Sequence, residues 1–189
     1  MSVFEEYNAL IKTKMGDKRY IHSVNMAKQA VHLAEKYGAD IEKAQIAGIL
    51  HDITKEMPID EQLQLMKKSG IILTDLQMLS PKLWHSISGA CYIKNILGID
   101  DEDIFNAVRY HTTGRANMSL LEKVIFIADF TGEERDYPGA DEMKAAAEES
   151  LEKAMEIGIT FSITDLIERR LAVATDSLDA YNEIVINKI

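Results

Sequence analysis

Cysteine, proline and excess positive charge are all scarce in this 189-residue sequence. The single cysteine, Cys91, excludes an internal disulfide and a cysteine-based zinc site, and this suits a reducing cytoplasm. The 21 basic residues are outnumbered by 31 acidic ones, which gives a formal net charge of −10. That balance argues against nucleic acid or an acidic membrane as a partner, because both bind basic surfaces. A phosphate-binding pocket in such a protein needs a compact basic patch, or metal ions in its place.

Long apolar runs and a leader segment are also missing. The longest apolar run, near residues 124–128, is far too short to cross a bilayer. The first residues, Met1-Ser-Val-Phe-Glu-Glu, lack the basic region and apolar stretch of a signal peptide. We therefore expect a soluble, cytoplasmic protein with no membrane partner.

Helical periodicity is what the sequence has in place of these features. Apolar residues recur every three to four positions, and no run alternates as a half-buried strand would. The chain contains only three prolines and is 47% apolar, which is enough for a substantial core. We predict an all-α fold, a helical bundle or an orthogonal array of helices, in which residues 1–189 form a single domain.

Turn and capping residues divide the chain into the expected helices. Asp40 is a predicted N-cap, Ser80-Pro81 is a predicted helix start, and Ser119 with Glu122 forms a predicted capping box. The helices are expected near residues 2–14, 17–37, 41–52, 59–69, 80–97 and 119–130, and one more is expected to open at Asp100 or Asp101 and to end near residue 112. An Ala/Glu-rich helix is expected to end near residue 157, and a long amphipathic helix to run from about 160 to 185.

The adjacent pair His51-Asp52 ends an apolar helical run, where ionisable side chains are costly unless they are paired or bind a metal. Other histidines and an aspartate also continue apolar helical faces: His22, His85, His111 and Asp129. Each of them alone is more often a structural residue with an ordinary hydrogen-bond partner. The fifth histidine, His32, lies among charged neighbours and is expected to face solvent.

Six nitrogen and oxygen donors on helices that must converge indicate a metal site. Four imidazoles and two carboxylates suit iron, manganese or zinc, and they suit calcium or magnesium poorly. Six ligands are also more than one open catalytic ion needs, so Asp52 is a candidate bridge between two ions. The spacing is consistent with such a binuclear site but does not establish it.

The order of these residues resembles the HD superfamily of metal-dependent phosphohydrolases, in its binuclear branch. The local strings are similar to those of the YqeK-like family, the bacterial symmetrical bis(5′-nucleosyl)-tetraphosphatases, which split diadenosine tetraphosphate into two ADP. The strings are Arg19-Tyr-Ile-His22, His51-Asp52-Ile-Thr-Lys55, His85-Ser-Ile-Ser-Gly89, Arg109-Tyr-His111-Thr-Thr-Gly114 and Ile127-Ala-Asp129. The resemblance covers nearly the whole chain. One departure is that segment 130–134 lacks the expected proline, which bears on the position of Arg135.

The resemblance implies how the ions are held and what they do. One ion would be bound by His22, His51, Asp52 and Asp129, and the other by Asp52, His85 and His111. The family implies two divalent iron ions, although the ligands alone also accept manganese. A metal-bridging hydroxide would attack phosphorus, with a dinucleoside polyphosphate as substrate and a nucleoside diphosphate as product.

Nearby cations are candidate phosphate contacts. Lys55 lies one turn beyond His51, so Asp52 and Lys55 are the candidate catalytic residues. Further candidate substrate contacts are Thr113, Arg115, Arg135 and Arg19, the first two because they flank the turn after His111. Each of these cations has the alternative of a surface ion pair.

Other functions remain open at the level of the sequence. A mononucleotidase of the same superfamily and an oxygenase with two iron ions would both use such ligands. A cyclic-dinucleotide esterase is disfavoured because the Gly-Tyr-Pro motif expected for it is missing. A metal-stabilised binding module is the non-enzymatic alternative. Trp84 could stack on a base or pack in the core, and the terminal helix could pack on its own domain or pair two copies into a homodimer.

Overall fold

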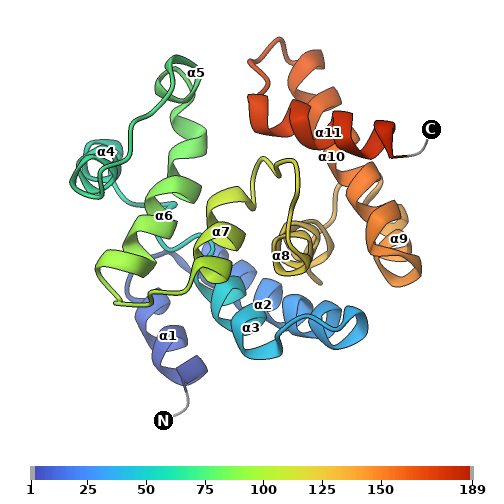
Figure 1. Cartoon of the computed structure of the whole chain (residues 1–189). Helices are drawn as coiled ribbons and strands as arrows, with labels where there is room; N and C mark the ends of the chain where they lie inside the picture. The colour runs from blue at the N-terminus through green and yellow to red at the C-terminus, as the bar shows by residue number, and fades with distance from the viewer. Residues whose placement is uncertain (1–2, 188–189) are drawn as a thin grey trace.

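In this computed structural model, which describes residues 3–187, the chain folds into helices joined by short turns, and no strand occurs within that range (Figure 1). The prediction of an all-α fold is therefore confirmed. The first helices are α1 (Val3–Lys12), α2 (Asp17–Tyr37), α3 (Ile41–Leu50), α4 (Ile59–Lys68) and α5 (Asp75–Met78). A 3₁₀ turn (Pro81–Leu83) leads into α6 (Trp84–Asn95), α7 (Glu102–Tyr110) and α8 (Leu120–Thr131). The last are α9 (Ala140–Glu149), α10 (Leu151–Glu168) and α11 (Thr175–Ile186).

Helices α2 and α3 pack closely because a glycine lies where their backbones meet. A Cβ atom added to Gly48 would lie 2.8 Å from the Cα atom of Ala27, closer than real side chains approach. Met26 and Ala30 on α2 are fully buried beside this contact. The close approach brings the end of α3 beside the first half of α2, which carries His22.

Helix α8 lies at the centre of the fold. It packs against α2, α3, α7, α9 and α10, and in Figure 1 it lies between α7 and the α9–α10 pair. Its residues 124–128 are completely buried, which explains the longest apolar run of the sequence as core. Asp129 follows this run directly, and the packing of α8 against α3 holds it near the C-terminal end of α3.

Helix α4 packs on α6 over a small second core of Met66, Trp84, Ile87 and Cys91. The indole nitrogen of Trp84 donates to the carbonyl oxygen of Gln77 over 2.7 Å, and the side chain is 4% exposed. Of the two interpretations of Trp84, packing is the one that the structure favours. Cys91, the single cysteine of the chain, is buried in the same small core.

The capping residues predicted several helix starts correctly. Asp40 accepts from the Lys43 N–H, Asp101 accepts from the Ile104 N–H, and Ser119 with Glu122 forms both bonds of a capping box. The first predicted helix began at residue 2, which lies outside the described residues. His51-Asp52 follows the end of α3 instead of lying within it.

Several expected boundaries differ from those in the structure. The helical segment begins at Pro81 as expected, but its first residues form a 3₁₀ turn before α6 starts at Trp84, and Ser80 makes no capping bond through its side chain. In the last third of the chain, the break comes at Ser150, whose side chain caps α10, and α10 runs on through residue 157. The long terminal helix is divided at residues 169–174, where Arg170 adopts a positive φ of 54°. Helix α5, with its Thr74–Gln77 capping box, was missed.

No helix in the described part of the chain has the length and apolar character needed to span a bilayer.

Candidate metal centre

The side chain of His51 is fixed by the end of its own helix. His51 is the C-cap of α3, and its Nδ1 atom lies 2.8 Å from the carbonyl oxygen of Gly48, which α3 leaves without a helical partner. A bond to that carbonyl places the proton on Nδ1. The Nε2 atom therefore keeps its lone pair and points away from the helix.

The same local arrangement orients two further histidines. The Nδ1 atom of His85 lies 2.8 Å from the Lys82 carbonyl oxygen, and that of His111 lies 2.7 Å from the Val108 carbonyl oxygen. In each case the acceptor is three residues earlier in the chain. Both imidazoles thus present an unprotonated Nε2 atom, and these two atoms lie 3.3 Å apart.

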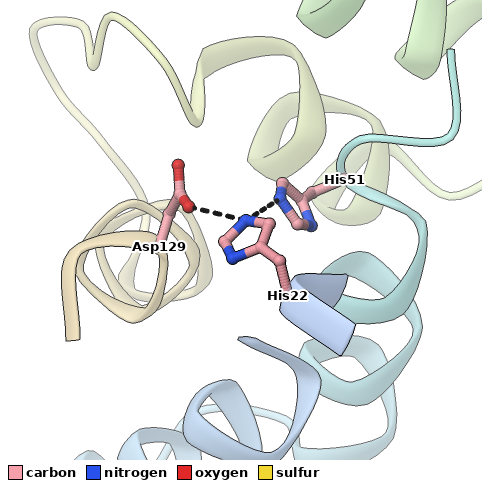
Figure 2. A group of neighbouring side chains, drawn as sticks. All are labelled: His22, His51 and Asp129. Carbon is pink, nitrogen blue, oxygen red and sulfur yellow. Dashed lines mark hydrogen bonds and ion pairs between the residues drawn. The ribbon is translucent and has the colours of Figure 1, made fainter. Parts of the chain in front are cut away.

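His22 comes from the first half of α2 and faces His51 and Asp129, which lie on other segments (Figure 2). Its Nε2 atom lies 3.1 Å from Nε2 of His51 and 3.1 Å from Oδ1 of Asp129, at the end of α8. Its Nδ1 atom lies 2.5 Å from Oε1 of Glu134, a residue of the segment between α8 and α9. Helices α2, α3 and α8 therefore bring one donor each to a common point.

Asp52 lies between the histidines and is 3% exposed. Its Oδ2 atom accepts from Arg19 over 2.7 Å. Its Oδ1 atom is buried without a hydrogen bond, 3.4 Å from Nε2 of His85 and 3.7 Å from Nε2 of His111. A buried carboxylate oxygen without a partner is costly, so this atom calls for a cation.

The structure brings all six predicted ligands into one cluster. The donor atoms form two sets, and within each set all of them lie within 4.8 Å of one another. One set is His22, His51 and Asp129, and the other is His51, Asp52 and His111. His85 adjoins the second set through Asp52 and His111. In this arrangement His51 belongs to both sets, whereas the sequence resemblance placed it on one ion alone.

These donors fit divalent metal ions. Two Nε2 lone pairs that face each other at 3.1 or 3.3 Å have no proton to share when each Nδ1 carries one. A cation between them removes that repulsion and also satisfies the orphaned Asp52 oxygen. Imidazole nitrogens combined with carboxylates are a ligand set for first-row transition metals.

The electrostatics keep three of the donors, Asp52, Asp129 and His85, in the forms that bind metal. Burial works to raise the pKa of Asp52, but the imidazoles of His51 and His111 hold that pKa well below its usual range. Burial likewise opposes ionisation of Asp129, but its contacts with His22 and Arg135 hold its pKa low. Burial lowers the pKa of His85 to about 3, so this imidazole is neutral at pH 7.

Three of the predicted substrate contacts surround the cluster. Arg19 binds Asp52, and Arg135 binds both the carboxylate and the backbone carbonyl of Asp129. The Nζ atom of Lys55 lies 2.9 Å from Nε2 of His85 and 3.9 Å from Oδ1 of Asp52. Burial lowers the pKa of Lys55, against the attraction of Asp52. All three cations are about one-third exposed, so each can also reach a ligand.

Arg115 is not brought to this cluster. Its guanidinium makes two bonds to the buried carboxylate of Glu122, at 2.6 and 3.1 Å. It lines a separate cavity between the start of α8 and helices α10 and α11. Its candidacy as a phosphate contact rested on nearness in sequence to His111, and the turn at Gly114 (φ 64°) directs the chain elsewhere.

A cleft of about 550 Å³ opens beside the cluster. His85, His111, Asp129, Lys55 and Thr113 line its inner end. Its walls come from the segment after α5 on one side and from α10 and the segment before α11 on the other, which lie to the left and right in Figure 1. Apolar side chains dominate these walls, among them Leu79, Pro81, Leu83, Phe130, Phe161, Leu166 and Leu171.

Sequence reasoning missed several of these residues. Leu79 is 84% exposed and Phe161 is 41% exposed, and both line the cleft. Neither lies in a motif, and no local signal separates them from ordinary core residues. Glu134 was also missed, because it is 112 residues from His22 in the chain.

Known proteins are similar to this chain in sequence and in structure. Residues 19–131 match the HD domain family. The chain is 39% identical to a protein of Bacillus subtilis named "Bis(5'-nucleosyl)-tetraphosphatase, symmetrical", over 96% of this chain and 97% of that protein. A protein of the same name from Staphylococcus aureus is 33% identical over 94% of this chain and 92% of its own length.

A solved structure is similar over the same extent. It is described as a predicted HD superfamily hydrolase involved in NAD metabolism from Clostridium acetobutylicum. The two chains are 36% identical and superpose with a TM-score of 0.94, with 99% of each chain covered.

Proposed function

The chain belongs to the HD domain family and, within it, to the family of symmetrical bis(5′-nucleosyl)-tetraphosphatases, and on that premise we propose that it hydrolyses dinucleoside tetraphosphates symmetrically. Diadenosine tetraphosphate and water would give two ADP. The observation that carries the proposal is the match to the named relatives over nearly the full length of both chains. The convergence of the four histidines and two aspartates beside a cleft supports it.

We propose that the cluster binds two divalent ions, iron or manganese. One would be held by His22, His51 and Asp129, and the other by His85 and His111, with Asp52 between them. The separation of the donors into two overlapping sets supports this number. Such ions, when bound, lower the pKa of a water molecule and neutralise phosphoryl oxygens.

The protein's own contribution is to orient and neutralise the polyphosphate. Four ionised phosphates must enter a cleft that Asp129 lines and beside which Asp52 is buried, so cations have to offset that negative charge. Lys55 lines the cleft beside His85 and would donate to a phosphoryl oxygen there. Arg19 binds Asp52 and Arg135 binds Asp129. Both arginine side chains are about one-third exposed, and they would add positive charge beside that of Lys55.

The apolar walls suit a nucleoside. A volume of about 550 Å³ lies within the range of roughly 300–1,000 Å³ typical of small-molecule sites. Phe161 and Leu79 offer exposed apolar surface to a base. Thr113 also lines the cleft, and its hydroxyl donates to the Gly114 carbonyl oxygen over 2.8 Å. One nucleoside end of the substrate would thus lie in the cleft while the reacting phosphate lies over the donors.

A product assay tests the proposal. Protein supplied with ferrous or manganous ion should convert diadenosine tetraphosphate into ADP alone, and ATP plus AMP among the products would contradict symmetrical cleavage. The His51→Ala variant should lose the activity. His32→Ala is the matched control, since His32 is 50% exposed and binds Glu148 on the far side of α2. Assays with nucleoside monophosphates and with dissolved O₂ would detect a mononucleotidase or an oxygenase instead.

We also propose that residues 140–187 belong to the same domain as the matched region, and that the protein is cytoplasmic. The Ser177 hydroxyl of α11 donates to the Thr113 carbonyl oxygen over 2.8 Å, and α10 supplies one wall of the cleft. A chain ending after residue 139 should then lose activity. The single buried cysteine supports a reducing compartment.

A further inference from the structure

The four histidines of the cluster are oriented in two different ways. His51, His85 and His111 each bond through Nδ1 to a carbonyl oxygen three residues earlier, so their own helix ends orient them. His22 lies within α2, where the backbone carbonyl groups are used by the helix itself. Its Nδ1 atom instead meets the carboxylate of Glu134, which comes from a segment without regular structure.

The neighbours of Glu134 keep its carboxylate in place. Burial opposes ionisation of Glu134, but His22 and Asn25, which lies one turn beyond His22 on α2, lower the pKa of this carboxyl group. Gly132 leaves room for it: a Cβ atom at that position would lie 3.0 and 3.1 Å from the two carboxylate oxygens. Gly132 has a φ of −51°, which any residue adopts, so its lack of a side chain matters here for space.

We propose that Glu134 is a positioning residue for His22 and so sets the affinity of the ion site formed by His22, His51 and Asp129. This inference rests on the metal binding proposed above. With its Nδ1 proton bound to a carboxylate, the imidazole is fixed in its tautomer and orientation and becomes a stronger donor at Nε2. The other ion site contains only histidines that are bound to backbone carbonyl groups, so it does not depend on Glu134.

Titration with manganous ion tests the proposal on the full-length protein. Removal of such an outer partner typically weakens metal binding by about 10- to 100-fold. Glu134→Ala should weaken one of the two binding steps by that factor and leave the other step unchanged. Glu134→Gln, whose amide oxygen still accepts from Nδ1, should fall between wild type and Glu134→Ala. Glu133→Gln is the matched control, because Glu133 is exposed next to Glu134, and it should bind like wild type.

A second variant tests whether the position of the Glu134 carboxylate matters, and not only its presence. Gly132→Ala keeps Glu134 but displaces its flexible end from His22, so it should also weaken the same step. In the metal-free protein, ¹⁵N spectra of the imidazoles should show a changed tautomer balance at His22 alone in Glu134→Ala. Urea unfolding of each variant shows whether it is folded.

Three results would overturn the proposal: equal affinities for Glu134→Ala and Glu133→Gln, equal weakening of both steps in Glu134→Ala, or an unchanged His22 spectrum. None of these readouts uses the nucleotide. If the protein binds manganese in this pattern but leaves diadenosine tetraphosphate intact, the proposed reaction fails and the role of Glu134 stands.

Discussion

The hydroxyl group of Thr54 donates a hydrogen bond to the backbone carbonyl oxygen of His85 over 2.9 Å and thereby joins the turn after α3 to the first turn of α6. The same hydroxyl lies 2.8 Å from Oγ of Ser88. Thr54 is fully buried. Because Asp52 and His85 lie on the two joined segments, this one side chain fixes their relative position.

Thr54→Val should therefore destabilise the protein and weaken metal binding together. Valine has nearly the same shape, but it removes both hydrogen bonds of the buried hydroxyl, at a cost of about 1 kcal/mol each in the free energy of unfolding. Urea unfolding and a manganous-ion titration measure the two effects. Thr13→Val is the control, since the Thr13 hydroxyl bonds to the carbonyl oxygen of Leu10 at an exposed position. Equal losses in both variants would contradict the prediction.

The sequence predicted most of the helices in the first two-thirds of the chain, α5 excepted, because local signals there agree with the packing. Asp40, Asp101 and Ser119 cap helices in the structure, and Gly38 ends α2 with a φ of 79°. In the last third such signals are weak. The sequence predicts a break near residues 157–160, yet Gly158 lies inside α10. A glycine fits there because Met143 and Phe126 would lie 3.1 Å from an added Cβ atom.

The convergence of the cluster could also be anticipated, because ionisable groups on apolar faces must meet partners in the core. What the sequence could not give is the set of contacts made across long separations. Glu134 reaches His22 and Arg135 reaches Asp129 only through the path of the segment after α8. The prediction that Arg115 contacts phosphate fails for the same reason. Arg115 is close to His111 in the sequence, but in the structure it binds Glu122 and lines a separate cavity.

Lys55→Met should lower the rate of hydrolysis without removing the metal. The substitution keeps the length and apolar part of the side chain but removes the charge that would neutralise a phosphoryl oxygen, an effect worth about 100- to 1,000-fold in kcat. Metal content should stay at the wild-type level, because a cation beside His85 does not help a metal ion to bind. Steady-state kinetics and metal analysis of the same preparation measure both. Lys28→Met, at an exposed position on α2, should behave like wild type.

Gly48→Ala should increase the distance between α2 and α3 and destabilise the protein. The added methyl group meets the Ala27 backbone at 2.8 Å, so the helices must move apart, at a cost of about 1–3 kcal/mol that exceeds the gain of at most roughly 1 kcal/mol from helix propensity. His22 and His51 lie on these two helices, so metal affinity should fall as well. Thermal unfolding and metal titration measure the changes. Gly16→Ala is the comparison, because its nearest contact is Glu56 Oε2 at 3.7 Å; equal metal affinity in the two variants would refute the expectation.

Asp101→Asn should reduce stability at neutral pH but not in acid. Burial works to raise the pKa of Asp101, but Lys43 and the Ile104 N–H lower it below its unfolded value. A carboxyl group with a lowered folded pKa stabilises the protein above the unfolded pKa of about 3.9, and this contribution is lost as the pH falls through the folded pKa. Asparagine keeps the cap of α7 and loses the ion pair with Lys43. Urea midpoints of the two proteins should differ at pH 7 and converge below pH about 4; a constant difference would refute the role of the charge.

Arg115→Ala and Arg135→Ala should separate a structural arginine from one at the cleft. Glu122 is 1% exposed, and Arg115 supplies two of its bonds, so Arg115→Ala leaves a buried carboxylate partly unpaired and should cost about 1–3 kcal/mol in unfolding free energy. The KM of Arg115→Ala for diadenosine tetraphosphate should stay near the wild-type value, because the cavity that Arg115 lines is separate from the cleft.

Arg135→Ala should raise the KM and weaken metal binding through Asp129. Its effect on the free energy of unfolding should be smaller, since the Arg135 side chain is 32% exposed. Kinetics and urea unfolding of both variants decide the matter: a raised KM with unchanged stability in Arg115→Ala would return that residue to the list of phosphate contacts.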